Sequence, residues 1–151
     1  MAYKEGVAEI LERVSKIKSR KEQVATLRRD HNIALETIVD LCFNENLIFK
    51  LPDTDPPYKP QVKEADMQSQ LYNKSQLRKF AIFLKGVPEY RHLPKIKREN
   101  IFIQLLETLD PDDAKLVLSV KNKKMPYKGI TRKLFEEAWP ALASSWDKKE
   151  V

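Results

Sequence analysis

The sequence predicts an all-α fold, a compact bundle of about six to seven helices. Apolar residues recur at helical spacing along most of the chain. Only three glycines occur in 151 residues, too few for a sheet protein with many tight turns. Charged residues make up 33% and hydrophobic residues 42%, which is typical of a helix-rich globular protein. This length is expected to form a single domain with its own core.

The amino-terminal third contains three helix signals. Apolar residues at helical spacing mark a first helix within residues 7–17. Ser19 followed by Glu22 is a capping-box pattern, which predicts a second helix over 20–29. The apolar run at 33–42 predicts a third helix that is central to the fold.

The middle of the chain is less regular. Residues 51–60 contain four prolines and are predicted to form an extended surface loop, because proline interrupts helices. Residues 61–72 fit a short helix or irregular structure equally well. Asn73 is a cap for a fourth helix, which runs to Leu84 and ends at Gly86.

The carboxy-terminal third predicts three more helices. A long apolar pattern covers 95–108, and Asp110 begins a helix over 111–121 with good capping chemistry. Thr131 caps a last helix, which Pro140 ends. The expected organisation is therefore one helical domain over residues 1–142, with 51–60 as a loop within it, followed by a carboxy-terminal tail at 143–151.

The sequence gives little support for catalysis. Cys42, the single cysteine, lies in an apolar helical run and is predicted to be a buried structural thiol. His31 and His92 have no metal-ligand partner at useful spacing, and no phosphate loop or glycine-rich nucleotide motif occurs. We expect no enzymatic activity and no cofactor. The charged amino terminus and the lack of a long apolar run predict a cytoplasmic protein that does not contact membranes.

Basic residues are segregated along the chain, which carries a net charge of +6. Residues 121–133 include six basic side chains and no acidic one, and residues 74–98 include eight basic side chains and one acid. A third basic group lies at 16–21. A basic loop that leads into a helix is a natural place to hold phosphates. The simpler alternative is that these cations only solvate the surface.

Two segments, 9–51 and 116–149, resemble the amino-terminal DNA-binding domain of ATP-dependent DNA ligases, especially the ligase of T-even phages. The second has a basic, glycine-containing loop that leads into a helix ending in Trp139-Pro140. The resemblance implies a helical domain that grips duplex DNA through its phosphates, here as a small phage protein in the host cytoplasm. The chain lacks the Lys-x-Asp-Gly adenylation motif of the ligases, so ligation is not expected.

The leading hypothesis is a non-catalytic module that binds double-stranded DNA with little sequence preference. Its contacts are expected from the amino-terminal turn, the basic loop and the helix start that follows, provided that folding brings these segments together. We call these residues the predicted cradle: Arg20, Lys21, Lys123, Lys124, Lys128, Gly129, Arg132 and Lys133.

The alternative hypothesis is a protein-interaction adaptor or inhibitor. It would dock on a phage or host DNA-processing or transcription protein through the proline-rich loop and the tail. The expected anchors are Pro56, Pro57, Tyr58 and an exposed Trp146.

Overall fold

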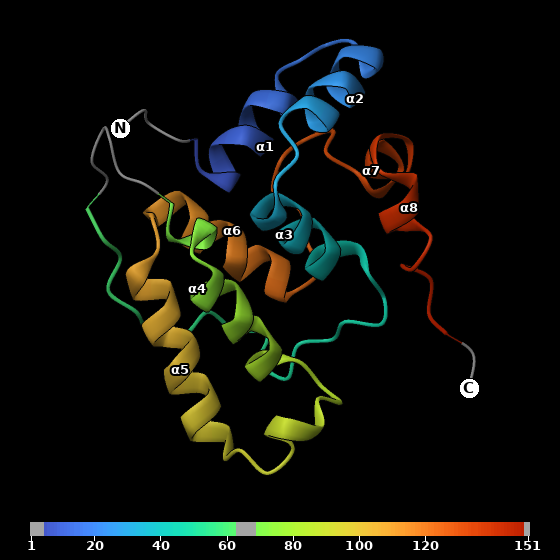
Figure 1. Cartoon of the computed structure of the whole chain (residues 1–151). Coiled ribbons are helices and arrows are strands. Elements are labelled where there is room, and N and C mark those ends of the chain that lie inside the picture. Colours follow the sequence, from blue (N-terminus) through green and yellow to red (C-terminus); the bar gives the residue numbers. More distant parts are fainter. Residues whose placement is uncertain (1–4, 63–68, 150–151) are drawn as a thin grey trace.

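A computed structural model describes residues 5–62 and 69–149, and this part of the chain is all-α, which confirms the predicted fold class (Figure 1). The α-helices are α1 (Val7–Ser15), α2 (Arg20–Arg29), α3 (Ile33–Phe43), α4 (Lys74–Arg78), α5 (Lys95–Thr108), α6 (Pro111–Lys121), α7 (Arg132–Ala138) and α8 (Pro140–Ala143). Short 3-10 segments lie at Gln70–Tyr72, Lys79–Phe83 and Pro88–Tyr90. The choice between helix and irregular structure for 61–72 falls largely on 63–68, which lie outside the described residues.

Polar caps fix the starts of five α-helices, in agreement with the sequence, and one of them is the predicted cap Asn73, whose side chain accepts from the Ser75 N–H of α4. The Ser19 hydroxyl accepts a hydrogen bond from a main-chain N–H of α2, and Asn32 does the same for α3. Asp110 caps α6 and Thr131 caps α7 in the same manner. Each cap satisfies one of the N–H groups that a helix start leaves without an internal partner.

Two helix ends differ from the sequence prediction. The fourth helix does not continue as an α-helix to Leu84; it changes to 3-10 geometry at Lys79. Three residues per turn place Phe80 and Phe83 on the same side, where both are buried. Pro140 does not simply end a helix, because it occupies the first position of α8, where proline is well tolerated.

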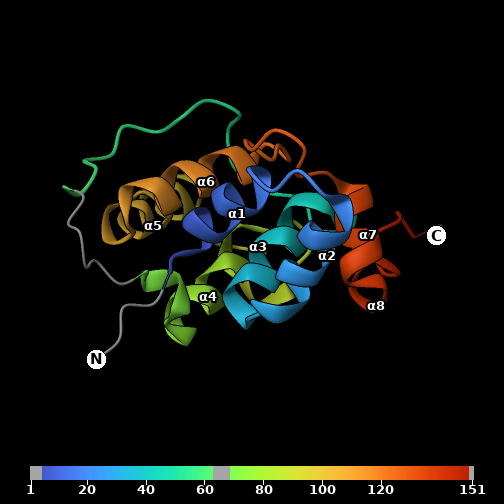
Figure 2. The same cartoon turned by 90° about the horizontal axis from the view of Figure 1, so that it is seen from above.

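Helices α3 and α6 pack together in the middle of the molecule (Figures 1 and 2). On one side, α1 contacts both α6 and α2, and α2 in turn packs along α7. On the other side, α5 lies against α6 and the 3-10 segment that follows α4. Fully buried side chains such as Leu35, Ile38 and Val117 form the core between these helices. No helix in the described part of the chain has the length and apolar character that a membrane span requires.

The prediction that Trp146 is an exposed anchor is wrong. Helix α8 turns the chain back toward α3, and Trp146 is completely buried there. Its indole N–H donates to the Asp40 carboxylate at 2.9 Å, and its carbonyl accepts from the Glu45 N–H at 2.8 Å. The segment after α8 therefore belongs to the packed fold as far as Lys149, whose N–H bonds to the Asn46 side chain.

Candidate functional site

Folding brings the two halves of the predicted cradle together, but it also pairs their arginines with acids. Helix α2 packs along α7, and the Arg20 guanidinium lies 3.2 Å from the Glu137 carboxylate. Arg132 has three carboxylate neighbours: Glu136 at 2.8 Å, Asp147 at 2.6 Å and Glu45 at 3.8 Å. Hydrogen bonds from carboxylates raise the pKa of Arg132, first from Asp147 and then from Glu136. The positive charge of both arginines is therefore largely cancelled locally.

Lys123 has a structural partner as well. Its ammonium donates to the main-chain carbonyls of Leu41 at 2.6 Å and Asn44 at 2.9 Å, at the end of α3. Its backbone has a φ of 61°, in the left-handed region that few non-glycine residues adopt. Burial lowers the pKa of Lys123. The side chain thus joins the loop after α6 to the end of α3.

The other members of the predicted cradle remain open. Four lysines are exposed and have no ion-pair partner within residues 5–62 and 69–149: Lys21, Lys124, Lys128 and Lys133. Gly129 is exposed at the turn before α7 and has a φ of 81°, which a side chain would strain. The predicted cradle therefore exists in space, with about half of its charges available.

A second cationic region is a surface hollow with a volume of about 580 Å³. It is lined from four separate segments, at 48–53, 85, 95–98 and 121–123. The basic side chains in the lining are Lys50, Lys85, Lys95, Arg98, Lys121 and Lys123. Asp53 is the only acid among the described lining residues. We call this region the basic hollow.

An antiparallel bridge positions two of these lysines. Phe49 pairs with Leu84, the Lys50 N–H donates to the Phe83 carbonyl at 2.6 Å, and the Lys85 N–H donates to the Ile48 carbonyl at 2.7 Å. Side chains alternate along extended backbone, so Phe49 is buried while Lys50 remains exposed. Lys50 and Lys85 are thereby held at one edge of the hollow.

The start of α5 adds positive charge to the hollow. Its first turn contains Lys95, Lys97 and Arg98, contains no acid, and has no side-chain cap. Helix starts carry a partial positive charge and usually attract acids, as in α6, whose first turn has Asp112 and Asp113. In α5 the first-turn side chains are positive, so their charge adds to the partial positive charge of the helix start.

Arg98 is a buried cation without a carboxylate. Only 2% of the residue is exposed, yet its guanidinium donates to two main-chain carbonyls, of Ile82 and Tyr90, each at 3.0 Å. Buried charges in proteins are usually paired with an opposite charge. The hydrogen bonds are satisfied here, but the charge has no counterion in the part of the chain that the structure describes.

Lys121 repeats this pattern on the other wall of the hollow. The residue is 5% exposed, and its ammonium donates to the carbonyls of Pro52 at 2.6 Å and Thr54 at 3.3 Å. Burial lowers the pKa of Lys121, while the nearby charges of Asp55 and Asp53 oppose this effect. Neither acid lies within ion-pair distance of Lys121. The basic hollow is therefore a concave site with excess positive charge, suited to an anion.

The sequence contains the signal for the hollow, because 74–98 is strongly basic, but nothing in the sequence joins that segment to 121–133. The described residues contain no group of three or more potential metal ligands among His, Cys, Asp and Glu. Cys42 is buried as predicted, and burial raises the pKa of its thiol to about 11.

The proline-rich segment is a non-helical, mostly exposed loop, in agreement with the sequence, and hydrogen bonds attach it to α5 and α6. We call residues 51–61 the strap, because it runs along the outside of α5 and α6 (Figure 2). Pro56 and Pro57 line a cavity against α5, and Tyr58 is half-buried against the core. Of the expected protein-docking anchors, only these three lie near the surface.

Comparison with known protein families gives a match of unknown function. A family model with the description "Family of unknown function (DUF6433)" matches residues 10–127, more than half of the chain. Searches of curated proteins and of solved structures find no match.

Proposed function

The chain belongs to the DUF6433 family, and we propose that it is a non-catalytic module that binds the phosphate backbone of duplex DNA in the basic hollow. The observation that carries this proposal is the pair of buried cations, Arg98 and Lys121, which no carboxylate neutralises in the described residues. A phosphate in the hollow would supply the missing negative charge.

The rim of the hollow fits a polymer of phosphates better than one small anion. Lys50, Lys85 and Lys95 are exposed and make no side-chain bond within the described residues, so their ammonium groups are available to several phosphates. Lys123 belongs to both the hollow and the predicted cradle, and Lys124 follows it directly, so the two basic regions adjoin at this point. Phosphate contacts supply affinity but no sequence information, so little sequence preference is expected.

The resemblance to ligase DNA-binding domains supports duplex DNA as the polyanion. The resemblance places the contacts in the predicted cradle, whereas charge balance favours the basic hollow. The proposal therefore keeps the expected partner and moves the centre of the interface. Lys124 and Lys128 are retained as peripheral contacts, and Arg20 and Arg132 are assigned to the packing of α7.

Two triple variants test whether DNA binds in the basic hollow or in the predicted cradle. Lys50→Glu/Lys85→Glu/Lys95→Glu reverses the rim of the hollow, and Lys21→Glu/Lys128→Glu/Lys133→Glu makes the same change of charge in the predicted cradle. Fluorescence anisotropy with short duplexes of unrelated sequence, over a series of salt concentrations, measures both. We expect the hollow variant to lose at least about 100-fold in affinity and to lower the salt slope by about three, one unit for each contact. The cradle variant should lose less than about tenfold, since it removes one peripheral contact, that of Lys128, and otherwise changes only the long-range field.

Circular dichroism and thermal unfolding would establish that both variants fold. Equal losses in the two variants would assign binding to overall charge and not to the hollow. If the wild-type protein fails to bind duplex DNA even at low salt, the proposed function is wrong.

A further inference from the structure

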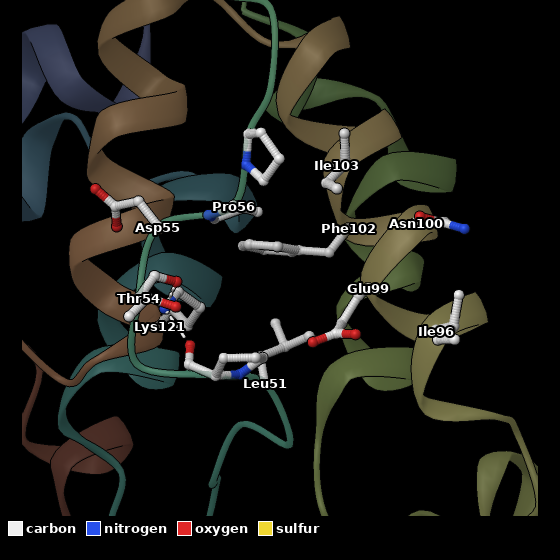
Figure 3. A pocket seen from close by; sticks show the side chains of 12 residues that line it. Leu51, Thr54, Asp55, Pro56, Ile96, Glu99, Asn100, Phe102, Ile103 and Lys121 are labelled. Carbon is white, nitrogen blue, oxygen red and sulfur yellow. Dashed lines mark hydrogen bonds between the residues drawn. The ribbon is translucent and has the colours of Figure 1, made fainter.

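A second cavity lies directly beside the basic hollow, between α5 and the strap (Figure 3). Its volume of about 280 Å³ is close to the lower end, roughly 300 Å³, of pockets that hold small ligands. The two spaces share Leu51, Pro52 and Lys121 as lining residues. We call this space the strap cavity.

Hydrogen bonds at both ends hold the strap over α5. At one end, the Lys121 ammonium bonds to the carbonyls of Pro52 and Thr54. At the other end, Glu107 accepts from the Lys59 N–H through its carboxylate and from the Gln61 side chain through its carbonyl, each at 2.8 Å. These attachments fix the position of the strap relative to α5, and therefore define the cavity between them.

The walls of the strap cavity are mainly apolar and include an aromatic ring. Figure 3 shows the Phe102 ring reaching from α5 toward Pro56 on the strap, with Ile103 on the same helix. The opposite part of the wall includes Leu51. A flat apolar group fits such a space, because aromatic rings and prolines offer extended surfaces for stacking.

Two carboxylates in the lining make no hydrogen bond or ion pair in the described parts of the chain, those of Glu99 and Asp55. Asp55 is exposed on the strap, whereas Glu99 is half-buried on α5. A carboxylate accepts hydrogen bonds and donates none, so it favours a ligand with N–H groups. By contrast, the Asn100 side chain points away from the strap in Figure 3.

We propose that the strap cavity receives one unpaired nucleobase of a strand whose phosphates occupy the basic hollow. This inference rests on the proposed function and names its substrate more closely: DNA with an unpaired nucleotide, in preference to a perfect duplex. The argument is the juxtaposition of an apolar, ring-lined cavity with a cationic hollow, which matches a base and its attached phosphate. Glu99 would accept from the exocyclic amino group of cytosine, whereas thymine offers only an N3–H flanked by two carbonyl oxygens that repel a carboxylate, so cytosine should bind better than thymine.

The test uses duplexes that differ by one unpaired nucleotide. Binding of the wild-type protein is measured for a perfect duplex, a duplex with one bulged cytosine and a duplex with one bulged thymine. We expect the bulged cytosine to bind about tenfold more tightly than the perfect duplex, a gain typical of burying one base. The bulged thymine should show a smaller gain.

Variants connect that gain to the cavity. Ile103→Trp fills the strap cavity and should abolish the gain from the bulge while leaving binding of the perfect duplex unchanged. Gln104→Trp makes the same substitution at the exposed neighbour, which does not line the cavity, and should keep the gain. Glu99→Ala should remove the difference between cytosine and thymine.

The outcomes separate this inference from the proposed function. If the perfect and bulged duplexes bind equally and both depend on the hollow lysines, the base-binding inference is wrong and the proposed function stands. If cytidine monophosphate alone binds as tightly as the bulged duplex, the site takes a free nucleotide, and the assignment to a strand is wrong. If no DNA binds, both proposals fail together.

Discussion

The basic hollow and the predicted cradle are both rich in cations, but their cations have different partners. In the hollow, Arg98 and Lys121 donate to main-chain carbonyls, which satisfy hydrogen bonds without cancelling charge. In the cradle, Arg20 and Arg132 face carboxylates, which do both. The positive charge that an anion can use therefore depends on whether each cation bonds to a carbonyl or to a carboxylate, and not on the number of cations.

In the region of the predicted cradle, arginine contacts hold α7 in place against α2. This helix is only seven residues long, and Arg28 from α2 donates to the carbonyls of Glu137 and Ala138 at its end. Cations are favoured at that end of a helix, where carbonyls lack internal partners. The arginines of this region thus face carboxylates or the negative end of a helix, whereas Arg98 and Lys121 in the hollow keep a positive charge that a ligand can use.

The largest expected effect is on the stability of the fold and concerns the buried Trp146. Trp146→Ala should lower the free energy of unfolding by about 3–5 kcal/mol, because it empties a completely buried site and removes the bond to Asp40. Trp146→Phe keeps most of the packing and should cost less. Urea denaturation measures both. A Trp146→Ala protein as stable as wild type would show that this residue is not part of the core.

A smaller effect compares one cation from each region. Lys121→Met removes the buried donor to the carbonyls of Pro52 and Thr54 and should cost about 1–3 kcal/mol of stability. It should also weaken DNA binding, because the hollow loses an uncancelled charge. Arg132→Met should cost at most about 1 kcal/mol, since its partners are solvent-exposed, and it should leave DNA affinity nearly unchanged. Unfolding curves and anisotropy on the same samples provide the comparison, and a greater loss of affinity for Arg132→Met would contradict it.

Local patterns in the sequence predicted most of the helices, but not α8 and not the change to 3-10 geometry after α4. Capping residues such as Ser19 and Asp110 act within one turn, so their effect does not depend on distant parts of the chain. The fourth helix departs from its pattern because Phe80 and Phe83 must both reach the core, which is a tertiary requirement. Similarly, the burial of Trp146 depends on Asp40, more than 100 residues away.

The candidate site was predictable only in part, for the same reason. The basic composition of 74–98 and 121–133 is visible in the sequence, and so is the absence of acid in the first turn of α5. The contact between these segments depends on the bridge of Phe49 with Leu84 and on the strap, which no periodicity predicts. The pairing of Arg20 with Glu137 also joins residues remote in sequence, so the loss of that charge could not be anticipated.

The smallest expected effect concerns pH and distinguishes the buried cations of the hollow from ordinary lysines. Burial lowers the pKa of Lys121 and Lys123 below the usual value of 10.5, so both should lose their protons before an ordinary lysine as pH rises. In that window the unfolded chain binds more protons than the folded chain, so the contribution of these lysines to stability rises with pH. DNA affinity should fall over the same window, because the hollow loses charge.

NMR titration of the lysine side chains and anisotropy at matched pH measure the two effects. Lys123→Met should reduce both changes, and pKa values at or above 10.5 for both lysines would contradict the burial on which the field of the hollow depends.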